Sequence, residues 1–295
     1  MADFILACSS TVDQPESFLK ERGIRYISFS WISDDGTVHP DDLGKSVSFP
    51  EFYRRMRNGS FPTTSQPNFQ DFRDFFEPFL REGKDILYVA VSSGISGACG
   101  TARSAAESLL EEYPDRKLFV VDSRNASPGY ALLMDGVYEQ QRAGHSIEEC
   151  RDWILMNRDK ADVWFFTTDL TWYIHGGRIK PVAGLVGKLL NICLVLTVDR
   201  AGTLIPKAKV RGKVRAVQLM LQNMESNVRG GLSYSGKVFL VHSDWKEEAE
   251  RIRALIEARF QRMVKPVIVS SIGCVIGSHS GPGTIAVAFW GEKEH

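Results

Sequence analysis

The sequence predicts an α/β protein of two domains: an N-terminal Rossmann-like domain with a mainly parallel sheet, and a C-terminal α+β domain with a mixed or antiparallel sheet. Three observations support this. The chain has 295 residues, more than one ordinary core accommodates. Strand-like and helix-like segments alternate in the first half, as in a parallel sheet covered by helices. In the second half, strand-like segments follow one another through turns, as in an antiparallel sheet.

Apolar runs separate amphipathic segments in the first half. Strands are expected at Phe4–Cys8, Tyr26–Ile32, Ile86–Val91 and Leu118–Val121. Helices are expected at Pro15–Arg22, Phe49–Arg57, Phe69–Glu82, Ala98–Glu112 and Ser127–Ala143. Ser146 and Glu149 have the spacing of a capping box, which predicts a helix that ends near Lys160. We place the domain boundary there, which gives domains at residues 1–160 and 161–295.

The second half has a different order of elements. Asp199–Gly202 is a predicted hairpin turn between two strands, and Asp169 is a predicted N-cap of a helix that ends at Gly176 and Gly177. Strands are expected at Val163–Thr168, Ile192–Val198, Leu204–Lys209, Lys237–Val241, Pro266–Ser271 and Thr284–Trp290. Further helices are expected at Lys213–Ser226 and Lys246–Arg262. This order predicts a separate α+β domain.

Composition argues against several classes of protein. Lys+Arg and Asp+Glu are equal at 36 each, so no net field attracts nucleic acid, and no nucleic acid partner is expected. The five cysteines form no C-x-x-C pair, which is typical of free thiols in a reducing cytosol. Cys8, Cys193 and Cys274 are expected in the core. The N-terminus lacks the pattern of a signal peptide, so we expect a cytoplasmic protein. The sequence has no H-x-x-x-H or paired His/carboxylate motif, so we expect no metal and no other cofactor.

Small hydroxyl residues and glycines concentrate in four segments: Thr63–Pro67, Ser92–Gly97, Asp122–Ser127 and Gly277–Thr284. Three of them adjoin predicted strands of the α/β half, where ligands bind at the carboxyl ends of strands. Ser92–Gly97 leaves a buried strand and enters a helix, so its N–H groups and hydroxyls are placed to face an anion. For any one loop, turn formation is the favoured explanation, and the presence of four such loops in one chain shifts the balance toward a binding site.

The motifs of several reaction types are missing or incomplete. The sequence has no P-loop, its glycines near residue 97 lack the dinucleotide spacing, and Gly94–Gly97 misses the nucleophile elbow by one residue. Two alternatives stay open: a hydrolase that uses a serine of Ser92–Ser96 with His279 and Asp122, and a sensor of a small phosphorylated or sugar ligand. The third reading is recognition of a carboxylate by neutral hydroxyl and amide donors.

A carboxylate with an apolar tail also needs a deep apolar pocket. The second half offers the residues for one, although each of them is also explained as ordinary core. They are Val163, Trp164, Phe165, Phe166, Leu185, Val186, Leu189, Leu190, Ile192, Val267, Ile268, Val275 and Ile276.

Five motifs, in one order along nearly the whole chain, resemble those of the DegV family. They are Thr64-Ser65-Gln66-Pro67; Ser92 to Gly97; Val120-Val121-Asp122-Ser123 with Ser127 and Gly129; Gly176-Gly177-Arg178-Ile179; and Gly277 to Gly283. Two positions depart from the family pattern. The usual D-S-T near the N-terminus reads Ser9-Ser10-Thr11, and Asn68 stands where serine is common.

The resemblance implies a function and a site. Members of this family bind fatty acids, and some are the binding subunit of a bacterial fatty acid kinase. By this resemblance, Ser93 and Thr64 hold the carboxylate of a long-chain fatty acid, and His279 and Arg178 belong to the surrounding polar network. The remaining expected ligand residues, from the same motifs, are Ser65, Gly94 and Ser278.

By the same resemblance, the protein itself has no catalytic activity, and an ATP-dependent kinase partner phosphorylates the bound carboxylate. The acyl tail is buried mainly in the second domain. Release of the acid requires movement of a lid or a transient encounter with a membrane.

Overall fold

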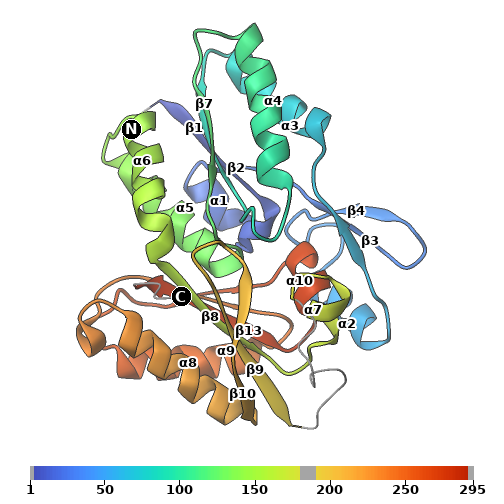
Figure 1. The fold of residues 1–295 in the computed structure, drawn as a ribbon, viewed down its shortest axis with the longest axis vertical. Helices are drawn as coiled ribbons and strands as arrows, with labels where there is room; N and C mark the ends of the chain where they lie inside the picture. The colour runs from blue at the N-terminus through green and yellow to red at the C-terminus, as the bar shows by residue number, and fades with distance from the viewer. Residues whose placement is uncertain (1–2, 180–190, 292–295) are drawn as a thin grey trace.

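A computed structural model describes residues 3–179 and 191–291 of the chain (Figure 1). Its first sheet, sheet A, has the strand order β2-β1-β6-β7, and every neighbouring pair is parallel. Its strands are β1 (Phe4–Ser9), β2 (Arg25–Ile27), β6 (Asp85–Ala90) and β7 (Leu118–Asp122). The predicted parallel sheet of the first half is confirmed.

Helices cover both faces of sheet A, with α3 and α4 on one side and α5 and α6 on the other (Figure 1). The first-half helices are α1 (Glu16–Glu21), α2 (Phe49–Arg57), α3 (Phe69–Arg81), α4 (Ala98–Glu112), α5 (Ser127–Arg142) and α6 (Ile147–Asn157). The predicted capping box at Ser146 and Glu149 is present, because each side chain accepts from the backbone N–H of the other residue. Short 3₁₀ turns lie at Ser10–Val12, Arg158–Lys160 and Gly231–Ser233.

The second half forms sheet C, in the order β10-β9-β8-β13-β11-β12. Its pairs are antiparallel except β11–β12, which is parallel, so the predicted mixed sheet is confirmed. Its strands are β8 (Ala161–Thr167), β9 (Ile192–Val198), β10 (Leu204–Arg211), β11 (Val238–His242), β12 (Ile268–Ser271) and β13 (Thr284–Trp290). The helices α8 (Lys213–Asn227) and α9 (Lys246–Arg259) pack on one face of it.

The two faces of sheet C belong to different cores, because alternate residues of a strand point to opposite faces. Trp164 and Phe166 of β8 join a core that is completed by α8 and α9. The alternate residues Val163 and Phe165 join the other core, which also contains residues of sheet A and α5. The second face therefore looks toward the N-terminal half of the chain.

The prediction of one strand over Tyr26–Ile32 is wrong. The segment forms two strands in different sheets, β2 in sheet A and β3 (Ser30–Ile32) in a small sheet with the order β4-β3-β5. Between them, the Phe29 N–H donates to the Ser10 hydroxyl at 3.2 Å, so the chain leaves sheet A at that residue. The other two strands are β4 (Val38–Pro40) and β5 (Thr63–Ser65).

The interpretation of Gly277–Thr284 as a loop is also wrong, because its first half lies in helix α10 (Cys274–Ser280). Gly277 is needed there for packing and not for a turn, since a Cβ atom would lie 2.5 Å from the Tyr53 hydroxyl. The preceding short helix, α7 (Thr171–His175), contacts α10.

All five cysteines are free and buried, as predicted for Cys8, Cys193 and Cys274. Within the described ranges, no helix combines the length and the apolar character that a membrane span requires.

Candidate functional site

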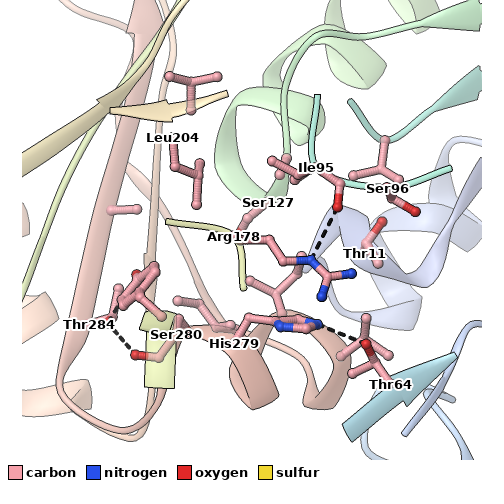
Figure 2. A pocket seen from close by; sticks show the side chains of 18 of the residues that line it. Thr11, Thr64, Ile95, Ser96, Ser127, Arg178, Leu204, His279, Ser280 and Thr284 are labelled. Carbon is pink, nitrogen blue, oxygen red and sulfur yellow. Dashed lines mark hydrogen bonds between the residues drawn. The ribbon is translucent and has the colours of Figure 1, made fainter. Parts of the chain in front are cut away.

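A cavity of about 320 Å³ lies between the carboxyl ends of sheet A and the face of sheet C that looks toward it. Both halves of the chain contribute to its lining (Figure 2). This is the position at which ligands are expected in an α/β sheet.

Most of the cavity wall is apolar. From sheet C it receives Val163, Phe165, Val198, Leu204 and Ala286, and from the α10 region Ile272, Val275 and Ile276. From the N-terminal half it receives Phe29, Val91, Ile95, Ala126 and Pro128. Such a wall stabilises an apolar ligand by removing its surface from water.

One side of the cavity is polar and is built around Thr64 and His279. Thr64 lies on β5, paired with Trp31, and His279 lies in the last turn of α10. The Thr64 hydroxyl oxygen and His279 Nε2 are 2.8 Å apart and share a hydrogen bond (Figure 2). Burial, assisted by the positive charge of Arg178 and opposed by a contact with the Gly176 backbone, lowers the pKa of His279 to about 4. The imidazole is therefore neutral near pH 7.

Arg178 lines the same side of the cavity and is the one ionised side chain among the described lining residues. Its guanidinium donates to the backbone carbonyl of Ile95 at 3.2 Å (Figure 2) and to that of Gly176 at 2.6 Å. Partial burial lowers the pKa of Arg178 from its ordinary value. Among the described residues, the partners of the Arg178 guanidinium are backbone carbonyls and not carboxylates, so the described lining carries a net positive charge.

Four of the residues expected from the sequence line this cavity together: Thr64, Ser65, Arg178 and His279. Their motifs lie more than a hundred residues apart, on β5, after α7 and on α10.

The three other expected residues do not line the cavity. Ser93 is exposed, and its hydroxyl donates to Asp122 at 2.6 Å. Gly94 lies against the β9–β10 hairpin, where a Cβ atom would be 2.7 Å from the Gly202 carbonyl oxygen. Ser278 is buried and donates to the Cys274 carbonyl at 2.8 Å. A ligand-binding role for these three residues stays a prediction.

Polar lining residues outside the expected set come largely from the same hydroxyl-rich segments. Ser96, whose hydroxyl donates to the Gln66 side chain at 3.1 Å, follows Ser93 in its loop. Ser127 begins α5 and donates to the buried carboxylate of Asp13. Thr11 belongs to the segment that departs from the D-S-T pattern. The hydroxyl-rich segments thus supply polar lining residues, but a loop sequence does not tell which hydroxyl faces inward.

The expected apolar pocket residues divide in the same way. Val163, Phe165, Val275 and Ile276 line the cavity, whereas Ile192 and Ile268 do not. The expectation is wrong for Trp164, Phe166 and Val267, which lie in the core under α8 and α9. Leu185, Val186, Leu189 and Leu190 lie outside the described residues.

The hydrogen bonds do not assemble the hydrolase that the sequence left open. The Ser92 hydroxyl donates to the Gly202 carbonyl at 2.8 Å, the Ser93 hydroxyl to Asp122, and the Ser96 hydroxyl to Gln66. His279 shares its hydrogen bond with Thr64 instead of a serine of this loop. A serine nucleophile with His279 as base requires a direct hydrogen bond between the two side chains. In the part of the chain that the structure describes, no cluster of His, Cys, Asp and Glu is suited to hold a metal ion.

The fold and the cavity define a class: a two-domain α/β protein with an apolar cavity between its sheets and one positively charged end. The sequence model of a family described as "Uncharacterised protein, DegV family" matches residues 6–292. A DegV domain-containing protein of Clostridium perfringens is 34% identical over 294 residues, which cover 100% of this chain and 99% of that protein. The chain therefore belongs to the DegV family.

Two further relatives have names that describe a ligand. A Thermotoga maritima protein named fatty acid-binding protein is 31% identical over 281 residues, which cover 94% of this chain and 93% of that protein. A solved structure from Thermus thermophilus, described as fatty acid binding of a DegV family protein, has a TM-score of 0.85 and 26% identity. That similarity covers 98% of this chain and 99% of the solved chain.

Proposed function

We propose that this chain binds a long-chain fatty acid in the cavity between sheets A and C. The observation that carries the proposal is the charge distribution of the lining, with one cation, Arg178, at one side of an otherwise uncharged and mostly apolar cavity. An amphiphile with one anionic group and a long apolar tail complements that distribution. The names of two relatives, which describe fatty acid binding, support the same ligand class.

The carboxylate in this proposal lies at the side formed by Arg178, Thr64 and His279. Arg178 supplies the positive charge, and a carboxylate near it gains a charge-assisted hydrogen bond. With the imidazole proton on Nε2, His279 donates to the Thr64 oxygen, so that the Thr64 hydroxyl proton is free to face the carboxylate. A neutral imidazole thus orients a neutral donor without adding a second positive charge.

The acyl tail lies against the apolar wall of Val163, Phe165, Val198 and Leu204. Burial of a tail of about sixteen carbons, at about 0.8 kcal/mol per methylene, gives a gross stabilisation on the order of 12 kcal/mol. Ordering of the tail and loss of ligand freedom cancel much of it. The remainder is enough for a ligand that stays bound during purification.

We further propose that the chain has no catalytic activity of its own and presents the carboxylate to an ATP-dependent kinase in the cytoplasm. The kinase transfers the γ-phosphoryl group of ATP to a carboxylate oxygen, which yields an acyl phosphate and ADP. This part rests on the resemblance to a family in which some members serve such a kinase. Addition of an ATP-dependent fatty acid kinase to the loaded protein, with hydroxylamine to trap acyl phosphate, tests it. A hydroxamate that forms without the kinase would contradict it.

The carboxylate site is tested by a pair of neighbouring threonines on β5. Thr64 lines the cavity, whereas Thr63 is exposed and outside the lining. Thr64→Val keeps the shape of the side chain and removes a donor to a charged group, so it should weaken palmitate binding roughly 10- to 100-fold in titrations of delipidated protein. Thr63→Val should leave the affinity unchanged. Equal affinities in the two variants would remove Thr64 from the site.

The same titration decides between two serines of the Ser92–Gly97 loop. Ser93 is the residue that the family resemblance assigns to the carboxylate, and Ser96 is the one that lines the cavity. If Ser93 turns from Asp122 to the ligand, Ser93→Ala weakens palmitate binding. If the geometry of the described chain is that of the complex, Ser96→Ala has the larger effect.

A further inference from the structure

The cavity contains a second group of polar side chains, formed by Tyr173, Ser280 and Thr284. They come from α7, the end of α10 and the start of β13. In Figure 2, Thr284 and Ser280 lie on one side of the view and Thr64 on the other, with His279 between them. None of the three belongs to the carboxylate site proposed above.

The hydrogen bonds of this group leave one hydroxyl without a partner. The Thr284 hydroxyl donates to the Ser280 backbone carbonyl at 3.0 Å, and Tyr173 Oη lies 3.4 Å from the Thr284 hydroxyl oxygen. Since the one Thr284 hydroxyl proton is already directed at the carbonyl, Tyr173 is the donor in that second contact. The Ser280 hydroxyl is buried, with 3% of the residue exposed, and has no hydrogen-bond partner among the described residues.

The surroundings of these hydroxyls are apolar. Ala286 follows Thr284 on the same face of β13 and pairs with Phe165, and both line the cavity. The Tyr173 ring stacks on Phe165, with centroids 6.0 Å apart. A buried hydroxyl in such a place is unfavourable unless something satisfies it. Ser280 is one of the residues that line the cavity, so the cavity is the adjoining space that can supply such a partner.

We propose that Tyr173, Ser280 and Thr284 form a second polar subsite, which binds a hydroxyl group on the acyl chain of the ligand. The proposal rests on the proposed function, and it makes a hydroxy fatty acid the preferred ligand class. A ligand hydroxyl donates one hydrogen bond and accepts others. It receives the Ser280 proton and donates to the free lone pairs of Tyr173 Oη. A ligand oxo group only accepts, and an unsubstituted tail leaves Ser280 unsatisfied.

The test is a titration of delipidated protein with stearic acid and with positional isomers of hydroxystearic acid. At least one isomer should bind about 3- to 10-fold more tightly than stearic acid, the gain of one neutral hydrogen bond. Ser280→Ala should abolish this advantage and leave stearic acid binding equal or tighter, because it removes a hydroxyl that the plain tail cannot satisfy. Tyr173→Phe should reduce the advantage in the same direction.

Ser270→Ala is the matched control, since Ser270 is a buried serine outside the cavity lining whose hydroxyl donates to the Asp13 backbone carbonyl at 2.7 Å. It should keep the ratio of the two affinities. The proposal is overturned if no isomer exceeds stearic acid in the unaltered protein, or if the advantage persists in Ser280→Ala. Binding of stearic acid itself reports on the proposed function separately, so a protein that binds stearic acid without discrimination refutes the subsite alone.

Discussion

The two faces of sheet C are built from the same strands but fulfil different requirements. Along β8, Phe166 enters the core under α8 and α9, where it is fully buried and its ring contacts Trp245. Phe165, one residue earlier, enters the side that contains the cavity. Helices α8 and α9 cover the first face, whereas the second face lines the cavity, beside loops that carry hydroxyl groups and one arginine. One face of a sheet can thus provide the packing that stabilises the fold, while the other face lines the space for a ligand.

The largest expected effect is on the free energy of unfolding, and it should differ between alanine substitutions of the two phenylalanines. Phe166→Ala leaves a void in a packed core and should lower the free energy of unfolding by about 3–5 kcal/mol in urea titrations of ligand-free protein. Phe165→Ala should cost less, because one side of that ring already faces the cavity and has fewer packing partners to lose. Equal losses would mean that the cavity side is packed as tightly as the sealed side, which would contradict the comparison.

The next prediction compares two alanines of β13 on the face of sheet C that contains the cavity. Ala286 lines the cavity, and Ala288, two residues on, is fully buried and does not. Ala286→Leu should extend into the cavity, reduce palmitate affinity about tenfold or more and change stability little. Ala288→Leu should overpack the core and lower stability by about 1–3 kcal/mol. Ala286→Leu should therefore have the larger effect on palmitate affinity, measured by titration, and Ala288→Leu the larger effect on stability, measured by urea unfolding.

The smallest effect is a pH dependence of stability that arises from His279 on the cavity side. The pKa of His279 is lowered from 6.5 to about 4 in the folded protein. Between these values the unfolded chain binds a proton that the folded chain does not, so His279 makes the protein less stable as pH falls through this window. Relative to His279→Gln, the ligand-free protein should lose about 1–3 kcal/mol between pH 7 and pH 4.

Asp41 acts in the opposite direction, and the comparison of variants removes its contribution. Burial raises the pKa of this carboxyl to about 6, so it adds stability as pH falls through that value. Because Asp41 is present in both proteins, its contribution cancels in the difference. Parallel stability curves for the protein and His279→Gln would show that His279 is not held neutral by the fold.

More of the fold than of the candidate site could be predicted from the sequence. Periodicity identified the parallel and mixed sheets, because a strand such as Ile86–Val91 is apolar throughout and its neighbours alternate with amphipathic helices. It could not find the break at Phe29, which depends on a hydrogen bond to Ser10 from a distant segment. It also mistook the one glycine of α10 for a turn residue, although Gly277 is required by its contact with Tyr53.

For the site, motif order predicted Thr64, Ser65, Arg178 and His279, which the structure brings to one cavity, but it could not orient single hydroxyls. Ser93 and Ser96 are equivalent as sequence, and only their partners, Asp122 and Gln66, distinguish them. Ser280, adjacent to His279 in the same motif, was not among the expected ligand residues, because the missing partner of its hydroxyl is a property of three-dimensional packing.

The central claim, a fatty acid in the cavity between the two sheets, is tested most directly by mass spectrometry of the purified protein. The protein is compared intact under native conditions and after denaturation, and the released small molecules are extracted and identified. We predict one long-chain fatty acid for each chain, and a hydroxylated acid among the released species if Ser280 has the role proposed for it. Ala286→Leu should carry less ligand than Ala288→Leu. Purified protein that releases no apolar ligand, and that binds none when palmitate is added, would contradict the account.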